Sequence, residues 1–320
     1  MRKEIRKQTN RTCGSLLVYY LIMTGIVMGA MFVKAVLTVI RAGDPQKAAL
    51  ALKTLESQMD GSLGVMSIAG VGAGLLFLYF VYRKRLRKEE LFREERPMNS
   101  HRFLKMLCLL MACQAVFSSA SILAELLLNP FGYTLQEAAR TATETSGSIS
   151  MVLYAGLAGP VAEELVFRGV VLRRLLPFGK GFAIVVSAVL FGVMHGNFLQ
   201  GIYAFFAGLV FGYVTAEYSL RWSVLLHILN NLVFGDLVGR LSQMLPQAAG
   251  DGLQLGITAG FFLAALWILW KNRKQVRRWW QENRPPRVYW AYGFTTVWML
   301  LFMLLNVAAA MNGVGKLQGM

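Results

Sequence analysis

Two adjacent glutamates, Glu163 and Glu164, lie with Arg168 in an otherwise apolar stretch, GLAGPVAEELVFRGVVL. A charged side chain near the centre of a bilayer is costly, so ionisable residues in such a segment mark functional sites. On a helix, residues four apart share a face, whereas adjacent residues point in different directions. The spacing therefore predicts that Glu164 pairs with Arg168 and that Glu163 is left free as a general base.

Two further apolar segments each contribute a histidine. His195 follows Phe191 by four residues in LFGVMHGNF, and His227 precedes Asn231 by four residues in LLHILNN. A histidine and an asparagine on one helical face can donate hydrogen bonds to a developing oxyanion. The alternatives are structural: a histidine satisfied in the core, an ion pair beside a protonated glutamate, or hydrogen bonds between helices, which Asn230 fits best.

A hydrolytic site within lipid needs water, and Gly159-Pro160 indicates how water could enter. Proline removes a backbone donor and kinks a helix, and irregular backbone in a membrane is tolerated where it lines a water-filled cavity. On straight helices, however, Glu163, His195 and His227 would lie roughly 15, 22 and 9 Å from the inner ends of their spans, at ~1.5 Å per residue. The spacing alone leaves open whether they meet.

The composition predicts the elements that carry these residues. Of the 320 residues, 56% are hydrophobic, and they come in blocks of roughly 17–25, enough for a helix to cross a ~30 Å hydrocarbon core. We therefore expect an all-α, polytopic transmembrane helical bundle of about eight or nine spans. The candidate spans are residues 15–36, 62–82, 103–127, 149–172, 181–200, 201–219, 222–239, 253–270 and 289–310.

The sequence makes a more specific prediction about the packing of the fifth and sixth spans. The fifth and sixth spans nearly abut, which requires either an antiparallel hairpin or a segment that enters the membrane without crossing it. The sixth span also carries a small residue at every fourth position, a pattern that lets helix backbones approach closely. These small residues are Ala204, Gly208, Gly212 and Ala216.

Lysine and arginine cluster at the ends of the spans. With the N-terminus inside, 25 of the 33 Lys and Arg residues fall on the inner side and seven on the outer side, as the positive-inside rule requires. This predicts an N-in, C-out topology. The net charge of +16 then reflects topology and attraction to anionic headgroups of the lipid bilayer, so we expect no nucleic-acid partner.

Together, the motifs indicate a family. EExxxR from Glu163, FxxxH from Phe191 and HxxxN from His227 occur in this order in separate apolar segments. In this respect the chain resembles the CAAX-protease and bacteriocin-processing family (CPBP, or Abi). This family includes the eukaryotic Ras-converting CAAX endopeptidase and many bacterial membrane proteins. The resemblance covers about residues 145–240.

The resemblance implies roles for these residues. Glu163 and His195 would activate a water molecule for attack on a peptide bond, and His227 with Asn231 would form the oxyanion site. The resemblance also implies that Glu164 is one of the catalytic residues.

Two residues support this set in the resemblance, Arg168 beside Glu164 and Phe191 beside the histidines. The chain then divides into N-terminal transmembrane helices with a cytoplasmic linker, a CPBP-like protease core, and C-terminal transmembrane helices. These parts are residues 1–144 with the linker at 83–102, residues 145–240, and residues 241–320. We expect the charged linker to be a helical extension that ends near Pro97. We expect the loop at 276–287, VRRWWQENRPPR, to be an interfacial anchor.

The cofactor stays open at this point. CPBP proteins are often labelled metalloproteases, and Glu163, His195 and His227 could bind zinc. The chain has no HExxH pair to require a metal, so metal-free catalysis is equally compatible with these residues.

The sequence thus favours an intramembrane endopeptidase that acts on a membrane-associated peptide or protein. Whether the substrate is prenylated is left open, and the compact chain fits a multi-pass protein of a bacterial cell membrane. One alternative is a proton- or ion-coupled transporter that uses Glu163, Glu164 and His195 as a relay, although we find no paired interrupted helices in two related halves. Another is a non-catalytic membrane scaffold or immunity protein.

Overall fold

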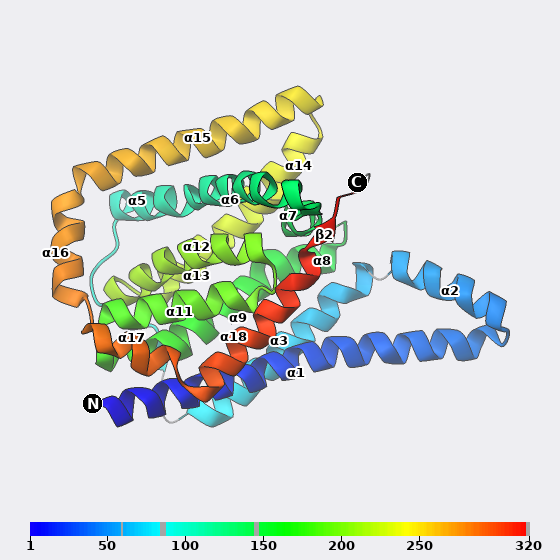
Figure 1. The fold of residues 1–320 in the computed structure, drawn as a ribbon, viewed down its shortest axis with the longest axis horizontal. Helices are drawn as coiled ribbons and strands as arrows, with labels where there is room; N and C mark the ends of the chain where they lie inside the picture. The colour runs from blue at the N-terminus through cyan, green and yellow to red at the C-terminus, as the bar shows by residue number, and fades with distance from the viewer. Residues whose placement is uncertain (59, 84–87, 144–146, 318–320) are drawn as a thin grey trace.

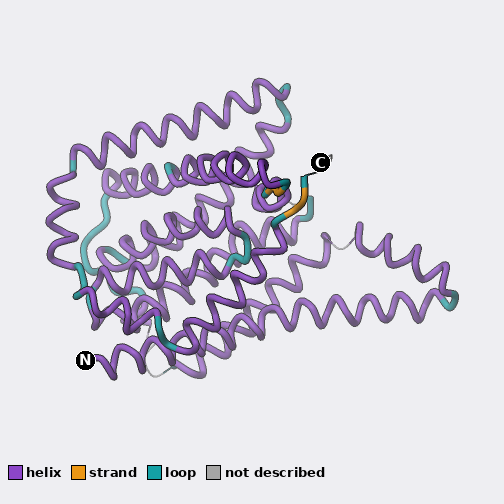
Figure 2. The backbone as a smooth tube through the Cα atoms, in the orientation of Figure 1, coloured by secondary structure: helices purple, strands orange, loops and turns teal. Residues whose placement is uncertain are grey.

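The computed structural model describes residues 1–58, 60–83, 88–143 and 147–317, and helices make up nearly all of this part (Figures 1 and 2). Two short strands, β1 (Tyr133–Thr134) and β2 (Gly315–Lys316), pair antiparallel beside the C-terminus. The predicted all-α polytopic fold is confirmed.

The α-helices are α1 (Arg2–Ala42), α2 (Pro45–Gln58), α3 (Asp60–Tyr82), α4 (Lys88–Leu91), α5 (Ser100–Met111), α6 (Cys113–Leu128), α7 (Gln136–Thr143), α8 (Ile149–Leu153), α9 (Gly159–Glu164), α10 (Arg173–Leu175), α11 (Lys180–Met194), α12 (Phe198–Glu217), α13 (Leu220–Ile228), α14 (Val238–Gln243), α15 (Gln247–Lys271), α16 (Arg273–Asn283), α17 (Arg287–Phe294) and α18 (Val297–Ala310). Three π-helical segments, η2 (Tyr154–Ala158), η3 (Leu165–Leu172) and η5 (Leu229–Leu237), interrupt them. Short 3₁₀ turns are η1 (Asn129–Phe131), η4 (Leu176–Phe178) and η6 (Met311–Gly313).

Seven helical segments among the described residues are long and apolar enough to cross a membrane, and an eighth is obtained if α17 and α18 count as one broken span. The chain is therefore an integral membrane protein. The span predicted at residues 289–310 is not a continuous helix, because a 71° bend separates α17 from α18. At the bend, the Thr295 hydroxyl donates to the carbonyl of Ala291, a local bond that often bends helices.

The predicted span at 181–200 is also wrong in its extent. Helix α11 has 15 residues and ends at Met194, so it is about 22 Å long and shorter than the ~30 Å hydrocarbon core. Gly196 follows with φ +59°, a conformation that glycine adopts at little cost. The Asn197 side chain then accepts hydrogen bonds from the first turn of α12. Helices α11 and α12 lie antiparallel, since Gly192 faces Gly201 and Gly212 faces Ile184.

Small residues allow α11 and α12 to approach closely, as the four-residue spacing predicts. A Cβ atom at Gly208 would lie 3.1 Å from the backbone of Ala188, and one at Gly212 would lie 3.0 Å from Ile184. At the other end of the hairpin, a Cβ at Gly192 would lie 2.6 Å from the carbonyl oxygen of Gly201. This contact lies between the two arms of the hairpin, next to the turn that carries His195.

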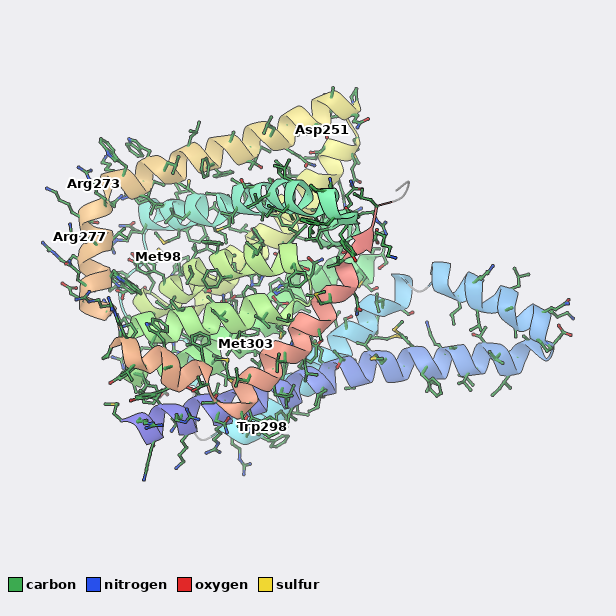
Figure 3. All side chains as sticks on the ribbon, in the orientation of Figure 1. Met98, Asp251, Arg273, Arg277, Trp298 and Met303 are labelled. Carbon is green, nitrogen blue, oxygen red and sulfur yellow. The ribbon has the colours of Figure 1, made fainter. Side chains whose placement is uncertain are left out.

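The segments predicted to lie inside gather at one end of the bundle, with the N-terminus and α16 (Figure 1). The buried Glu217 carboxylate connects three of them: Lys180 Nζ lies 2.6 Å away, Trp279 Nε1 2.9 Å away and Arg96 Nη1 3.3 Å away. At this end the labelled side chain of Arg277 projects outward (Figure 3). Helix α2, helix α7 and the C-terminus lie at the opposite end. The assignment of the basic end to the cytoplasm stays a prediction.

Two predictions about the charged connections are wrong. The linker is not a helix to Pro97, because α4 ends at Leu91 and the chain is irregular before α5; residues 84–87 lie outside the described part. The backbone of this linker is instead hydrogen-bonded to the core, with Glu95 N–H donating to Tyr218 O over 2.8 Å. The segment at 276–287 is mostly helical instead of a loop, since α16 continues to Asn283; its role as an interfacial anchor stays a prediction.

The close contact in the hairpin gives a direct test of the fold. Gly192→Ala should lower the unfolding free energy by about 1–3 kcal/mol, because the methyl group would meet backbone that cannot move aside cheaply. Gly72→Ala is the control, since nothing lies within 4 Å of a Cβ at Gly72. Thermal unfolding in detergent should show a lower Tm for the first variant alone, and equal Tm values would contradict this packing.

Candidate active site

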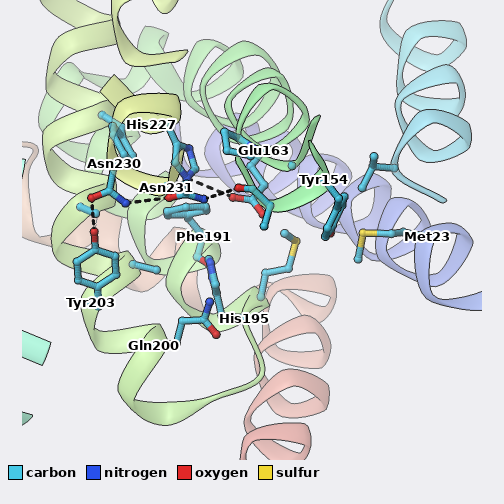
Figure 4. A pocket seen from close by; sticks show the side chains of 18 of the residues that line it. Met23, Tyr154, Glu163, Phe191, His195, Gln200, Tyr203, His227, Asn230 and Asn231 are labelled. Atoms are coloured by element: carbon cyan, nitrogen blue, oxygen red, sulfur yellow. Dashed lines mark hydrogen bonds and ion pairs between the residues drawn. The ribbon is translucent and has the colours of Figure 1, made fainter. Parts of the chain in front are cut away.

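The three motif segments meet at one cavity of about 310 Å³. Glu163 comes from α9, His195 follows α11, His227 lies on α13, and Asn231 lies in η5, and all four side chains line the cavity (Figure 4). The structure therefore brings together residues that straight helices would place at different depths.

Departures from regular α-helix help to bring these residues together. The π-helical segments η2 and η3 lie on either side of α9, and η5 begins directly after α13. In η2, the Gly159 N–H bonds to the Tyr154 carbonyl, five residues earlier. Such π-bulges add a residue to a turn and are frequent at functional sites. The irregularity expected at Gly159-Pro160 is present, and both residues line the cavity.

The two adjacent glutamates have different surroundings. The Glu163 side chain is 21% exposed and lines the cavity. Its Oε2 atom lies 3.7 Å from His227 Nε2. The Glu164 side chain is completely buried behind this surface. Only Glu163 is therefore placed to contact a molecule in the cavity.

Glu164 lies at the centre of a buried polar cluster. Its Oε1 atom is 3.0 Å from Arg168 Nη1, in the i,i+4 pair that the spacing predicts, and 3.1 Å from His227 Nδ1. Its Oε2 atom accepts a hydrogen bond from the Ser223 hydroxyl. Glu164 thus joins its own helix to α13 and orients the His227 ring, a role that spacing within one helix does not reveal.

Arg168 is held as tightly as its partner. Its side chain is completely buried, and its guanidinium lies 4.4 Å from the centre of the Phe191 ring and 5.1 Å from that of Phe211. Its Nη2 atom also donates to the Gly208 carbonyl over 3.3 Å. Aromatic faces attract a desolvated cation, so these rings compensate part of the cost of burying the charge.

His195 is oriented by its own helix. Its Nδ1 atom lies 2.8 Å from the Phe191 carbonyl oxygen. Because a carbonyl oxygen only accepts, Nδ1 must carry the proton, and Nε2 of the neutral ring is left as an acceptor. The Phe191 ring packs against His195 at 4.9 Å between centroids and against His227 at 5.8 Å. Phe191 therefore lies between the two histidines.

A chain of hydrogen bonds orients Asn231. The Tyr203 hydroxyl donates to Asn230 Oδ1 over 2.6 Å, Asn230 Nδ2 donates to Asn231 Oδ1 over 2.8 Å, and Asn231 Nδ2 donates to the Ala155 carbonyl over 2.9 Å (Figure 4). Asn230 therefore makes the bond between helices that was expected of it. The second amide hydrogen of Asn231 is left for a molecule in the cavity.

The residues do not fit the zinc site considered from the sequence. Among the described residues, no three His, Cys, Asp or Glu side chains gather closely enough to bind one ion. No step of the chemistry below is therefore derived through a metal.

Several residues around the cavity were not predicted from the sequence. Ser223 precedes His227 by four residues, so it shares its face, and this spacing could have indicated it. Tyr154 and Tyr203 line the cavity, but a tyrosine in an apolar span carries no comparable signal. Tyr19, on α1, also lines it, and only the packing of distant helices reveals this.

A comparison with known families decides how this arrangement is classified. Residues 145–233 match the family described as Rce1-like, type II CAAX prenyl endopeptidase. This segment is therefore similar to the Rce1-like family. The match includes all three motifs and supports the resemblance to CPBP intramembrane proteases; at family level it indicates an intramembrane endopeptidase of the CAAX-protease type. Neither the curated proteins nor the solved structures include a significant match.

The polar cluster around Glu164 leads to a testable prediction. Ser223→Ala should lower the unfolding free energy by about 1–3 kcal/mol, because it leaves a buried carboxylate oxygen without one of its donors. Ser121→Ala is the control, since within the described part of the chain the Ser121 hydroxyl bonds only to the Phe117 carbonyl of its own helix. Denaturation followed by tryptophan fluorescence should separate the two variants, and equal midpoints would contradict a structural role for this bond.

Proposed function

We propose that the protein is an intramembrane endopeptidase that hydrolyses a peptide bond in a membrane-associated peptide or protein by direct attack of an activated water molecule. The observation that carries the proposal is the position of Glu163. Its carboxylate opens into a cavity that also holds two histidines and an oriented asparagine. The Rce1-like family match favours hydrolysis over ion transport for this set of residues.

Glu163 acts as the general base. A water molecule in the cavity donates one hydrogen bond to the Glu163 carboxylate and the other to His195 Nε2, which accepts because Nδ1 holds the proton. As the water oxygen attacks the substrate carbonyl carbon, its proton passes to Glu163. Glu163 then gives this proton to the leaving amine, so that the base is regenerated.

His227 and Asn231 stabilise the oxyanion that forms in this attack. Asn231 offers the amide hydrogen that is not used on Ala155. His227 directs Nδ1 to Glu164 and Nε2 toward the side of the cavity where Glu163 lies, and Nε2 donates when the ring is doubly protonated. Donors fixed before the reaction stabilise developing charge without reorganisation, which is the largest single contribution in many enzymes.

Glu164 does not exchange protons with substrate in this proposal, although the resemblance counts it among the catalytic residues. It is completely buried and already accepts from Arg168, His227 and Ser223. Its role is to hold the His227 ring in place.

The test compares the products formed by active and inactive protein. Membranes containing wild type or Glu163→Ala should differ in the peptide fragments identified by mass spectrometry, and a farnesylated, internally quenched CAAX peptide should be cleaved by wild type alone. His195→Ala should also lose cleavage, by at least about 100-fold, because general-base and positioning contributions of this size are typical.

The matched control is Glu137→Gln. Glu137 is an exposed acid on α7 that pairs with Arg140 at 2.7 Å, away from the cavity, so this variant should keep wild-type activity. Retained turnover in Glu163→Ala or His195→Ala, in protein that is inserted and folded, would refute the assignment.

A further inference from the structure

The hydroxyl of Tyr19 is buried without a partner. Tyr19 lies on α1, outside the segment that matches the family, and its side chain is 0% exposed. Among the described residues, no atom forms a hydrogen bond with this hydroxyl. A buried donor without a partner is costly, and native proteins leave few of them. Its position therefore needs an explanation.

Tyr19 lies at the wall of the candidate active site. It lines the same cavity as Glu163, together with Met23 on α1 and Val71 on α3. Figure 4 shows Met23, one turn along α1, across the cavity from Asn230, with Tyr154 between them. Helix α1 thus forms the wall opposite the asparagines.

The ring of Tyr19 is held in place by a glycine. A Cβ atom at Gly74 on α3 would lie 2.6 Å from Cδ2 and 2.7 Å from Cε2 of Tyr19. Any other residue at Gly74 would therefore push the ring away from α3. By contrast, nothing lies within 4 Å of a Cβ at Gly72, two residues earlier. The fold fixes the ring, and with it the position of the hydroxyl.

A peptide bound within the membrane brings main-chain carbonyl groups that cannot find bulk water and must find donors in the protein. On the opposite wall, the Tyr203 hydroxyl already donates to Asn230, whereas the Tyr19 hydroxyl has its hydrogen available. We propose that Tyr19 binds the substrate by donating a hydrogen bond to a main-chain carbonyl of the peptide beside the scissile bond. This inference rests on the proposed function and extends the site to a helix outside the matched segment.

The experiment uses the full-length protein in detergent and the farnesylated, internally quenched CAAX peptide as the probe. Tyr19→Phe removes only the hydroxyl. It should raise KM about tenfold with kcat nearly unchanged, because the bond exists in both the ground state and the transition state. Its Tm should equal or exceed that of wild type, since the variant buries one polar group fewer without a partner.

Tyr20→Phe is the matched control. Tyr20 is the next residue on α1, and its ring packs against Phe302 at 6.3 Å instead of lining the cavity, so KM should not change. Gly74→Ala should reproduce the rise in KM by displacing the Tyr19 ring, whereas Gly72→Ala should not.

A second measurement separates this inference from the proposed function. Binding of the same peptide, labelled but not cleaved, is measured by fluorescence anisotropy on Glu163→Gln and on Glu163→Gln combined with Tyr19→Phe. The double variant should bind about tenfold more weakly. Equal affinity, or a fall in kcat at constant KM, would overturn the role of Tyr19 while cleavage by wild type upholds the proposed function. Absence of cleavage by wild type with a retained affinity difference would overturn the proposed function alone.

Discussion

The buried ion pair between Glu164 and Arg168 is the contact on which the rest of the site depends. Neither side chain has any exposed surface, and their charged atoms lie 3.0 Å apart. Breaking a buried pair by removing one partner typically costs about 3–5 kcal/mol, because the other charge is left uncompensated. The pair lies inside an apolar bundle despite this cost. The contacts of its two side chains with other helices show which elements it connects.

Both side chains also contact residues of other helices. Glu164 reaches α13 through His227 and Ser223. Arg168 reaches the α11–α12 hairpin through the Phe191 ring and the Gly208 carbonyl. A Cβ atom at Gly208 would lie 3.2 Å from Cδ1 of Phe191, so the glycine leaves room for the ring that contacts the guanidinium. One packing arrangement thus includes the small residues of the hairpin, the aromatic rings around the guanidinium and the orientation of His227. Glu163 is the carboxylate that this arrangement leaves open to the cavity.

The part of this arrangement that lies within single helices could be predicted from the sequence. The Glu164–Arg168 pair follows from its i,i+4 spacing, and the close hairpin follows from the small residues of α12. The contact between Glu164 and His227 could not be predicted, because it joins residues 63 positions apart and depends on helices interrupted by η2, η3 and η5. Gly159-Pro160 indicates irregular backbone next to η2, but no pattern in the sequence indicates η3 or η5.

The ends of the spans could likewise not be predicted from the sequence. An apolar run predicts that a helix exists, but the end of α11 depends on the turn at Gly196 and the cap at Asn197, and the break between α17 and α18 depends on local bonds of Thr295. The composition of the charged linker after α3 predicted a helix. Its backbone instead forms hydrogen bonds with Tyr218 and Ser219, which follow α12, and these bonds hold it in an irregular conformation. Tyr19 belongs to the same class, since its place at the cavity arises from the packing of α1 and α3 against the core.

The central claim is that two adjacent glutamates have separate roles, one in chemistry and one in structure. The most direct measurement is the thermal stability and the peptide cleavage of Glu163→Gln and Glu164→Gln, determined side by side on purified full-length protein. We expect Glu163→Gln to be inactive with a Tm close to that of wild type, and Glu164→Gln to be inactive with a large fall in Tm. A Glu163→Gln protein that still cleaves the peptide, or a Glu164→Gln protein as stable as wild type, would contradict the account.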